Sequence, residues 1–269
     1  MSTPSTFPAR LVRWRKHRGL SQLQLALRTG CSQRHVSFLE LGRTKPSREM
    51  VLRLTASLDV PLRNSNELLL LAGFAPVWTE TEFGALHRTP VRDALDHILA
   101  QQEPFPAVVV DRRWNVLQAN QGAVALVEFL VGPLRPGAAL NLADALAAPD
   151  GLKPYLSNWA DVVRYFLRSV EADAVADGTA ETAGLLARLL NYDGVRPAML
   201  AAAPLTPEGP VLPMHFQKDS IRLQLFTTIA TLGTPQDITL QELRIESFFP
   251  MDGDTREVFH EWARRRAGK

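Results

Sequence analysis

The hydrophobic positions near the start of the chain predict a short first helix that ends at a glycine. Pro8 is favoured in the first turn of a helix, because it has no backbone N–H to satisfy and its φ angle is already helical. Apolar side chains then recur up to about Arg18, and Gly19 marks the end. The pattern therefore predicts a helix over residues 8–18.

Two more short helices follow, with a tight turn between them. Ser21 is a candidate N-cap for the first, which ends at Gly30. Ser32 is a candidate N-cap for the second, which runs from Gln33 to Leu41. The positions expected to face inward are Leu23, Ala26, Leu27, Val36 and Leu39. The spacing predicts a helix-turn-helix.

The later part of the chain predicts an antiparallel sheet with helices packed on it. The alternation of apolar and polar residues from Ile221 to Leu225 is typical of a strand with one solvated face. The expected strands are Phe105–Asp111, Trp114–Ala119, Val211–Lys218, Ile221–Leu232 and Leu240–Phe249. The expected helical stripes are Trp159, Val163, Phe166 and Leu167, and Leu185, Leu186, Leu189 and Leu190. We expect an all-α N-terminal domain followed by an α+β domain.

Length and charge also favour two domains. The chain has 269 residues, more than one domain usually contains. We expect residues 1–75 to form the first domain, 76–102 a linker with a connecting helix, and 103–269 the second domain. Residues 1–75 hold 12 Lys or Arg and 4 Asp or Glu, a net charge of +8, which leaves −6 on the remainder. This asymmetry indicates a polyanionic partner for the first domain, although a solvated basic surface is the alternative.

The predicted helix-turn-helix carries side chains suited to reading DNA. The second helix of this motif lies in the major groove and presents its first residues to the bases. Gln33 can pair with adenine and Arg34 with guanine, whereas Gln22 lies at a helix N-terminus, which favours a phosphate. The predicted DNA contacts are Gln22, Ser32, Gln33, Arg34, Ser37, Arg43 and Lys45. Ordinary solvent-facing polar residues are the alternative interpretation.

These motifs resemble those of a known family of regulators. They are Ser21-Gln22-x-x-Leu25-Ala26, Gly30-Cys31-Ser32-Gln33 and Val36-Ser37-x-Leu39-Glu40-x-Gly42-Arg43-x-x-Pro46-Ser47. Over about residues 8–75 the chain resembles the XRE family of lambda-repressor-like helix-turn-helix transcription regulators. The resemblance implies an ion pair between Arg15 and Glu40 that orients the recognition helix. His35 and Phe38 depart from the small or polar residues usual in the family.

The second half resembles a ligand-binding domain. The motifs are Val110-Asp111-Arg112-Arg113-Trp114-Asn115-Val116, Asn120, Asn141-Leu142 and Leu225-Phe226-Thr227-Thr228-Ile229-Ala230. Over about residues 104–252 the chain resembles the PAS-like ligand-binding domain of MmyB-like (MltR-type) transcription regulators. The resemblance implies an apolar pocket between sheet and helices for a small hydrophobic ligand, with fatty acids as one class. Many relatives carry Arg-His-Pro where this chain has Pro213-Met214-His215-Phe216.

Apolar side chains that could line such a pocket lie on both sides of the expected interface. They are Trp114, Val116, Tyr155, Trp159, Val163, Phe166, Phe226 and Ile229. Candidates to anchor a carboxylate are Tyr155, Arg164, Arg196 and His215. The apolar set could equally be plain core, and each polar candidate could be structural.

Nothing in the sequence groups residues for catalysis or for a metal. There is no phosphate-binding loop, dinucleotide fingerprint or cysteine pair, and the six His are scattered. Glu171, Asp173 and Asp177 are spaced like a solvated helix face. We expect no enzyme, no catalytic residues, no metal and no cofactor beyond a possible bound fatty acid or similar ligand. The single Cys31 and the absence of a secretory or membrane-spanning segment favour a cytoplasmic protein.

The expected partners follow from these two domains. They are a double-stranded DNA operator, a small hydrophobic ligand and a second copy of the chain, since one short module makes few base contacts. The alternative is a regulator whose second domain only dimerises or binds a protein, without a ligand.

Overall fold

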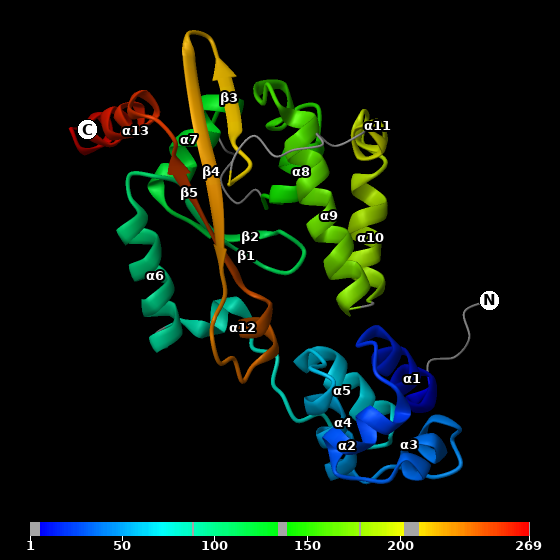
Figure 1. Ribbon diagram of the computed structural model, residues 1–269. Coiled ribbons are helices and arrows are strands. Elements are labelled where there is room, and N and C mark those ends of the chain that lie inside the picture. Colours follow the sequence, from blue (N-terminus) through cyan, green and yellow to red (C-terminus); the bar gives the residue numbers. More distant parts are fainter. Residues whose placement is uncertain (1–5, 88, 134–138, 178, 202–209, 269) are drawn as a thin grey trace. The chain divides into compact units, whose positions relative to one another are not determined.

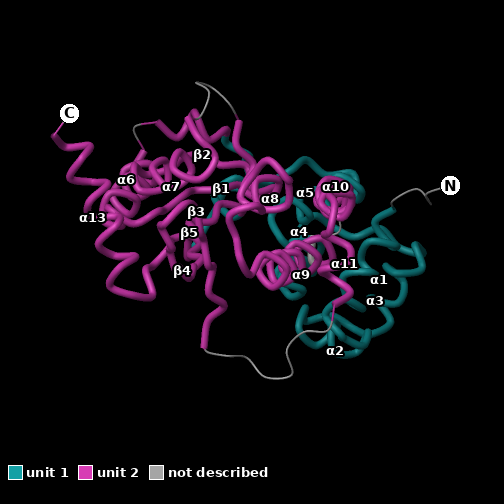
Figure 2. Tube along the Cα trace, turned by 90° about the horizontal axis from the view of Figure 1, so that it is seen from above, with its two compact units in different colours: residues 1–81, 234–241 teal, residues 82–233, 242–269 magenta. Residues whose placement is uncertain are grey.

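The chain forms two compact units. The computed structural model describes residues 6–87, 89–133, 139–177, 179–201 and 210–268. One unit contains Met1–Thr81 and Thr234–Gln241, and the other contains Glu82–Gly233 and Glu242–Lys269 (Figure 2). We call them unit 1 and unit 2. Residues 1–5, part of the start in which no secretory signal is expected, lie outside the described residues.

Unit 1 is built from helices around one core. Its helices are α1 (Phe7–His17), α2 (Gln22–Thr29), α3 (Gln33–Glu40), α4 (Arg48–Ser57), α5 (Leu62–Leu71) and most of α12 (Ile238–Glu242). Ser21 caps α2 through a reciprocal pair of hydrogen bonds with Gln24, and Gly30 ends it in a left-handed conformation with φ of 65°. Ser32 caps α3. The three predicted helices are confirmed, each within one residue of its expected bounds.

The inward face of α2 differs from the prediction. Leu23 and Leu27, expected to be buried, are 51% and 74% exposed, whereas Leu25 and Ala26 are buried. The helix is only two turns long, so its packing against α3 and α4 decides which side faces inward. The inward positions of α3 are confirmed, and the unit 1 core also includes Leu11, Leu54 and Leu68.

Unit 2 contains one antiparallel sheet of five strands in the order β2-β1-β5-β4-β3. The strands are β1 (Ala107–Val110), β2 (Val116–Ala119), β3 (Met214–Lys218), β4 (Ile221–Ala230) and β5 (Arg244–Pro250). All four pairings are antiparallel. The predicted α+β architecture is therefore confirmed.

Several strand boundaries differ from the prediction by one to four residues, and two of these differences have a clear local reason. The fifth strand begins at Arg244 rather than Leu240, because the preceding residues form α12 and the Asp237 carboxylate accepts a hydrogen bond from Leu240 N. The second strand begins at Val116, because Trp114 has a left-handed backbone with φ of 65°.

Helices cover the sheet on both sides. The helical elements are η1 (Phe83–Leu86), α6 (Pro90–Gln102), α7 (Gln121–Val131), α8 (Leu142–Ala147), η2 (Lys153–Tyr155), α9 (Trp159–Asp177), α10 (Ala180–Leu189), α11 (Val195–Leu200) and α13 (Gly253–Ala267). Figure 1 shows α6 on one side of the sheet and α9, α10 and α11 on the other. Buried side chains of β1 and α9, including Val108, Val110, Val163 and Leu167, form one core cluster.

The segment between β4 and β5 belongs to unit 1. The Asp237 carboxylate accepts hydrogen bonds from the hydroxyls of Thr79 and Thr81, both at 2.8 Å, and Ile238 N donates to Thr79 O at 2.9 Å. Leu62 N donates to the Gln241 side chain at 2.7 Å. The division expected near residue 75 does not include this returning segment, nor residues 76–81, which lie in unit 1.

A helix that crosses a bilayer is long and continuously apolar, and this can be checked for the helices among the described residues. None of them is both long enough and apolar enough to cross a membrane.

Candidate DNA-binding surface and ligand site

The start of α3 presents two exposed polar side chains. Gln33 and Arg34 are exposed, and Ser37, one turn later, is half-buried. Ser32 is exposed, but its hydroxyl accepts a hydrogen bond from His35 N at 3.1 Å and so caps the helix. The opposite face of α3 is fixed in the core. This arrangement suits a helix that is held rigidly and inserts its first turn into a groove.

A part-buried ion pair fixes α3 to α1. Arg15 Nε lies 2.6 Å from Glu40 Oε1 and Arg15 Nη2 lies 2.9 Å from Glu40 Oε2, so the pair is bidentate. The hydrogen bond to Glu40 raises the pKa of Arg15 above its usual value, against the effect of burial. The predicted pairing of these two residues is confirmed.

Gln22 is a further partner of the same carboxylate. Its Nε2 donates to Glu40 Oε2 at 2.7 Å, and the residue is half-buried. The amide therefore links the start of α2 to the end of α3. Its expected contact with a phosphate remains a prediction.

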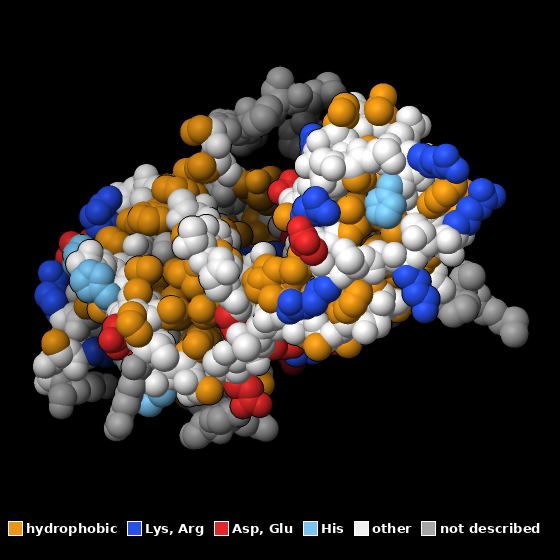
Figure 3. All heavy atoms as spheres, turned by 90° about the horizontal axis from the view of Figure 1, so that it is seen from below, with side chains coloured by type: hydrophobic (Ala, Val, Ile, Leu, Met, Phe, Trp, Pro, Cys, Tyr) orange, Lys and Arg blue, Asp and Glu red, His pale blue; other side chains and the backbone are white. Residues whose placement is uncertain are grey.

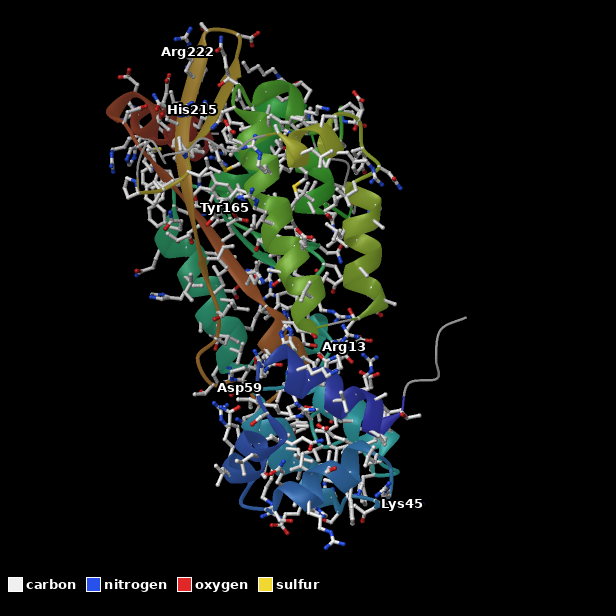
Figure 4. All side chains as sticks on the ribbon, turned by 45° about the vertical axis from the view of Figure 1, so that its right-hand side comes forward. Arg13, Lys45, Asp59, Tyr165, His215 and Arg222 are labelled. Carbon is white, nitrogen blue, oxygen red and sulfur yellow. The ribbon has the colours of Figure 1, made fainter. Side chains whose placement is uncertain are left out.

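Phe38 organises the basic side chains beside α3, which the sequence did not suggest. The guanidinium carbons of Arg34 and Arg43 lie 5.1 Å and 5.8 Å from the centre of its ring. Cation–π contacts of this kind limit the freedom of both arginines. Arg43 and Lys45 are exposed on the connection between α3 and α4, and Figure 4 shows Lys45 pointing outward.

Charge alone does not delimit the surface. Lys and Arg side chains occur at several separate places on the face shown in Figure 3. Arg13, which contributes to the basic total of the first 75 residues, lies on α1 at the far side of unit 1 from Lys45 (Figure 4). The geometry of α3, rather than the net charge, marks the candidate DNA-binding surface.

Most of the predicted ligand-lining residues come together between the sheet and α9. The buried cluster there contains Trp114 and Val163, with Val116, Trp159 and Phe166 packed against it. The Trp114 and Phe166 rings are 4.6 Å apart between centroids. Tyr155 packs on the adjoining cluster, which shares Trp159 and Phe166 with the first.

Phe226 and Ile229 are outside both clusters. Phe226 stacks on Phe249 at 5.4 Å. Its strand neighbour Leu225 lies in a cluster with Val162 of α9, so Phe226 points to the sheet face away from α9. Ile229 is on the sheet face that packs against α9, but its side chain is 49% exposed. The structure therefore does not bring these two residues together with the rest.

The proposed anchors for a carboxylate are engaged elsewhere or lie apart. Arg164 is buried, donates to Ala198 O at 2.9 Å and pairs with Asp161 at 3.1 Å. Arg196 is exposed, and His215 lies on β3 (Figure 4).

Two charged residues on the sheet face that packs against α9, Arg244 and Glu246, were missed in the sequence. Arg244 pairs with Asp173 at 2.6 Å, so Asp173 is not part of a purely solvated helix face. Glu246 is buried beside them, and burial raises its pKa to about 7, although a hydrogen bond from Thr227 and the charge of Arg244 lower it. The only sequence signal was two charges at alternate positions of a strand that is otherwise largely apolar.

The part of the chain that the structure describes contains no group of three or more His, Cys, Asp or Glu placed to hold a metal ion.

Comparison with known families agrees with both halves of this description. A helix-turn-helix family matches residues 11–63. The family described as the MmyB-like transcription regulator ligand binding domain matches residues 91–261, well over half of the chain. Neither family is enzymatic. A comparison with curated proteins found no match. The chain therefore belongs to the family of the MmyB-like transcription regulator ligand binding domain, and in this chain a DNA-binding helix-turn-helix of the XRE type precedes that domain.

Proposed function

We propose that the protein regulates transcription by reading an operator with α3, and that a small hydrophobic molecule bound in unit 2 changes this reading. One observation carries the DNA half of the proposal. Gln33 and Arg34 are exposed at the first turn of a helix whose far end is fixed by the part-buried Arg15–Glu40 pair. Gln and Arg side chains at that position match the hydrogen-bonding edges of adenine and guanine.

The apolar cluster under α9 supports the ligand half. Trp114, Trp159 and Phe166 supply the aromatic surface that small-molecule sites usually contain. The strand order β2-β1-β5-β4-β3 agrees with the PAS-like domain that the resemblance implies. Fatty acids are the ligand class to test first.

The regulatory mechanism we propose is a shift between two conformations of a homodimer. Paired recognition helices would meet half-sites about 34 Å apart, one turn of DNA. A ligand that binds one arrangement of the dimer better than the other would change the affinity for the operator.

The test of DNA reading is an Arg34→Ala variant on an operator selected from randomised duplexes. Loss of a bidentate contact to guanine should cost about 1–3 kcal/mol of binding free energy, and selectivity at that base should relax. Electrophoretic mobility shifts at several salt concentrations measure both effects.

Arg53→Ala is the matched control, because Arg53 is a half-exposed arginine on α4 with only a 3.9 Å pair to Glu49. It should leave selectivity unchanged. If Arg34→Ala and Arg53→Ala bind the selected duplex equally well, α3 is not the reading helix.

Native mass spectrometry tests the ligand half against the alternative of a unit that only dimerises or binds a protein. A small apolar molecule released on denaturation supports a ligand site. A protein that carries none and binds no added fatty acid supports the alternative.

A further inference from the structure

Two buried polar atoms near the sheet face that packs against α9 lack a hydrogen-bond partner. Among the described residues, Glu246 Oε2 and Trp114 Nε1 have no hydrogen bond. Two other atoms share this property, Arg92 Nε and Gln118 Oε1, but these side chains lie beside Asp96 of α6 and interact with it. An unpaired buried acceptor and an unpaired buried donor are costly, so each marks a place where a partner is missing.

The sheet register places Glu246 on the sheet face that packs against α9. Glu246 pairs with Val108 on β1 and with Ile229 on β4, so its side chain shares their face. Val108 belongs to the cluster that contains Trp114 and Val163. The carboxylate of Glu246 therefore faces the apolar cluster under α9.

Trp114 contacts Arg244, which lies on the same strand as Glu246. Its ring lies 4.6 Å from that of Phe166, and the Arg244 guanidinium carbon lies 5.2 Å from the ring centre. Arg244 is two residues before Glu246 and shares its face of the strand. The indole N–H and the carboxylate thus flank one arginine.

The face opens toward solvent beside Glu246. Along β4, the side chains on this face change from buried at Leu225 through half-buried at Thr227 to 49% exposed at Ile229, the register partner of Glu246. A molecule that enters at Ile229 would meet Glu246 before the aromatic cluster.

We propose, on the basis of the ligand-sensing function above, that Glu246 and Trp114 form the polar end of the ligand site and select a molecule that donates a hydrogen bond. Glu246 accepts from the head group, and the Trp114 indole donates to a ligand oxygen. A fatty alcohol meets this requirement directly. An ester of the same length has no donor and does not.

A fatty acid can donate a hydrogen bond to Glu246 only if one proton is shared between the two carboxyl groups. Two carboxylates cannot both ionise at close range, so the ligand and Glu246 would hold one proton between them. The charge of Arg244, two residues earlier on β5, lowers the pKa of Glu246, and Arg244 itself pairs with Asp173 of α9. Thr227 on β4 and Val108 on β1 are uncharged. Burial raises the pKa of Glu246 to about 7. Below pH 7 Glu246 therefore already carries this proton, whereas above pH 7 the complex must take it up from the solvent.

The test compares three ligands of one chain length: 1-dodecanol, dodecanoic acid and methyl dodecanoate. Titration calorimetry on the full chain at pH 8 should give at least about tenfold tighter binding for the alcohol than for the ester. Glu246→Leu, which leaves no acceptor, should abolish this preference. The affinity for the acid should fall about tenfold per pH unit above pH 7, and Glu246→Gln should remove that slope while the alcohol still binds.

Two outcomes would contradict the head-group site, and they differ in what they say about ligand sensing. An alcohol-to-ester ratio that is the same in the wild type and in Glu246→Leu overturns the head-group site while the ligand-sensing function stands. Binding of none of the three compounds contradicts both proposals. Thermal unfolding without ligand shows that each variant is folded, and Trp114→Phe, which removes the indole N–H, should weaken the acid and the ester alike.

Discussion

At the scale of single residues, the Arg15–Glu40 pair decides whether α3 is held in place. The Glu40 side chain is 5% exposed and that of Arg15 is 12% exposed, so removing one partner leaves the other charge poorly hydrated. Glu40→Ala should lower the free energy of unfolding by about 3 kcal/mol. It should also weaken operator binding, since Gln22 loses its acceptor as well. Urea unfolding measures the first effect and mobility shifts the second.

The Arg10–Glu67 pair provides the control. Its N···O distance is also 2.6 Å, but its side chains are 21% and 35% exposed. Because solvent screens such a pair, Glu67→Ala should cost no more than about 1 kcal/mol. Equal losses in the two variants would show that burial does not distinguish the pairs.

At the scale of elements, the α12 segment depends on Asp237. Burial would raise the pKa of this carboxyl, but hydrogen bonds from Thr81, Thr79 and backbone amides outweigh it and lower the pKa. The ionised form therefore stabilises the fold above the unfolded pKa, and this contribution is lost as the pH falls through the lowered value.

Asp237→Asn should destabilise the protein by about 2 kcal/mol at pH 7, because hydrogen bonds to a charged group are replaced by weaker ones. The difference from the wild type should shrink toward pH 3. Hydrogen exchange of Ile238 N, which donates to Thr79 O, gives a local measure of the same change. Thr79→Val removes a single donor and should have a smaller effect. A difference that does not change with pH would mean that the charge of Asp237 contributes nothing.

At the scale of the whole molecule, unit 1 and unit 2 are joined by three chain connections, at residues 81–82, 233–234 and 241–242. A ligand bound in unit 2 therefore has covalent routes to unit 1 through the strands β4 and β5 as well as through the segment before α6. Coupling between two sites is reciprocal by thermodynamic necessity.

We expect the ligand and the operator to change each other's affinity for the protein by the same factor. If a bound ligand alters the operator dissociation constant by some factor, saturating operator should alter the ligand dissociation constant by the same factor. Fluorescence titrations of each site, with and without the other partner, measure the two factors. An unaltered operator affinity in saturating ligand would contradict the proposed regulation.

The sequence alone predicted the elements that depend on local chemistry. Ser21, Gly30 and Ser32 cap or end their helices through bonds within a few residues, so the helix-turn-helix could be predicted from spacing. The same holds for the alternation in β4 and for Trp114, Trp159 and Phe166 as neighbours between sheet and helix.

Only the tertiary structure decided features that depend on residues far apart in the chain. The burial of Leu25 in place of Leu23, the return of Asp237 to Thr79 and Thr81, and α13 as a closing helix all depend on long-range packing. Glu246 is the clearest case. A glutamate in a strand is unremarkable in sequence. Its carboxylate is buried, with Oε2 left without a hydrogen bond, because β1 and β4 flank β5 at this position. Local hydrogen bonds determined the elements, whereas long-range burial determined the chemistry of the site.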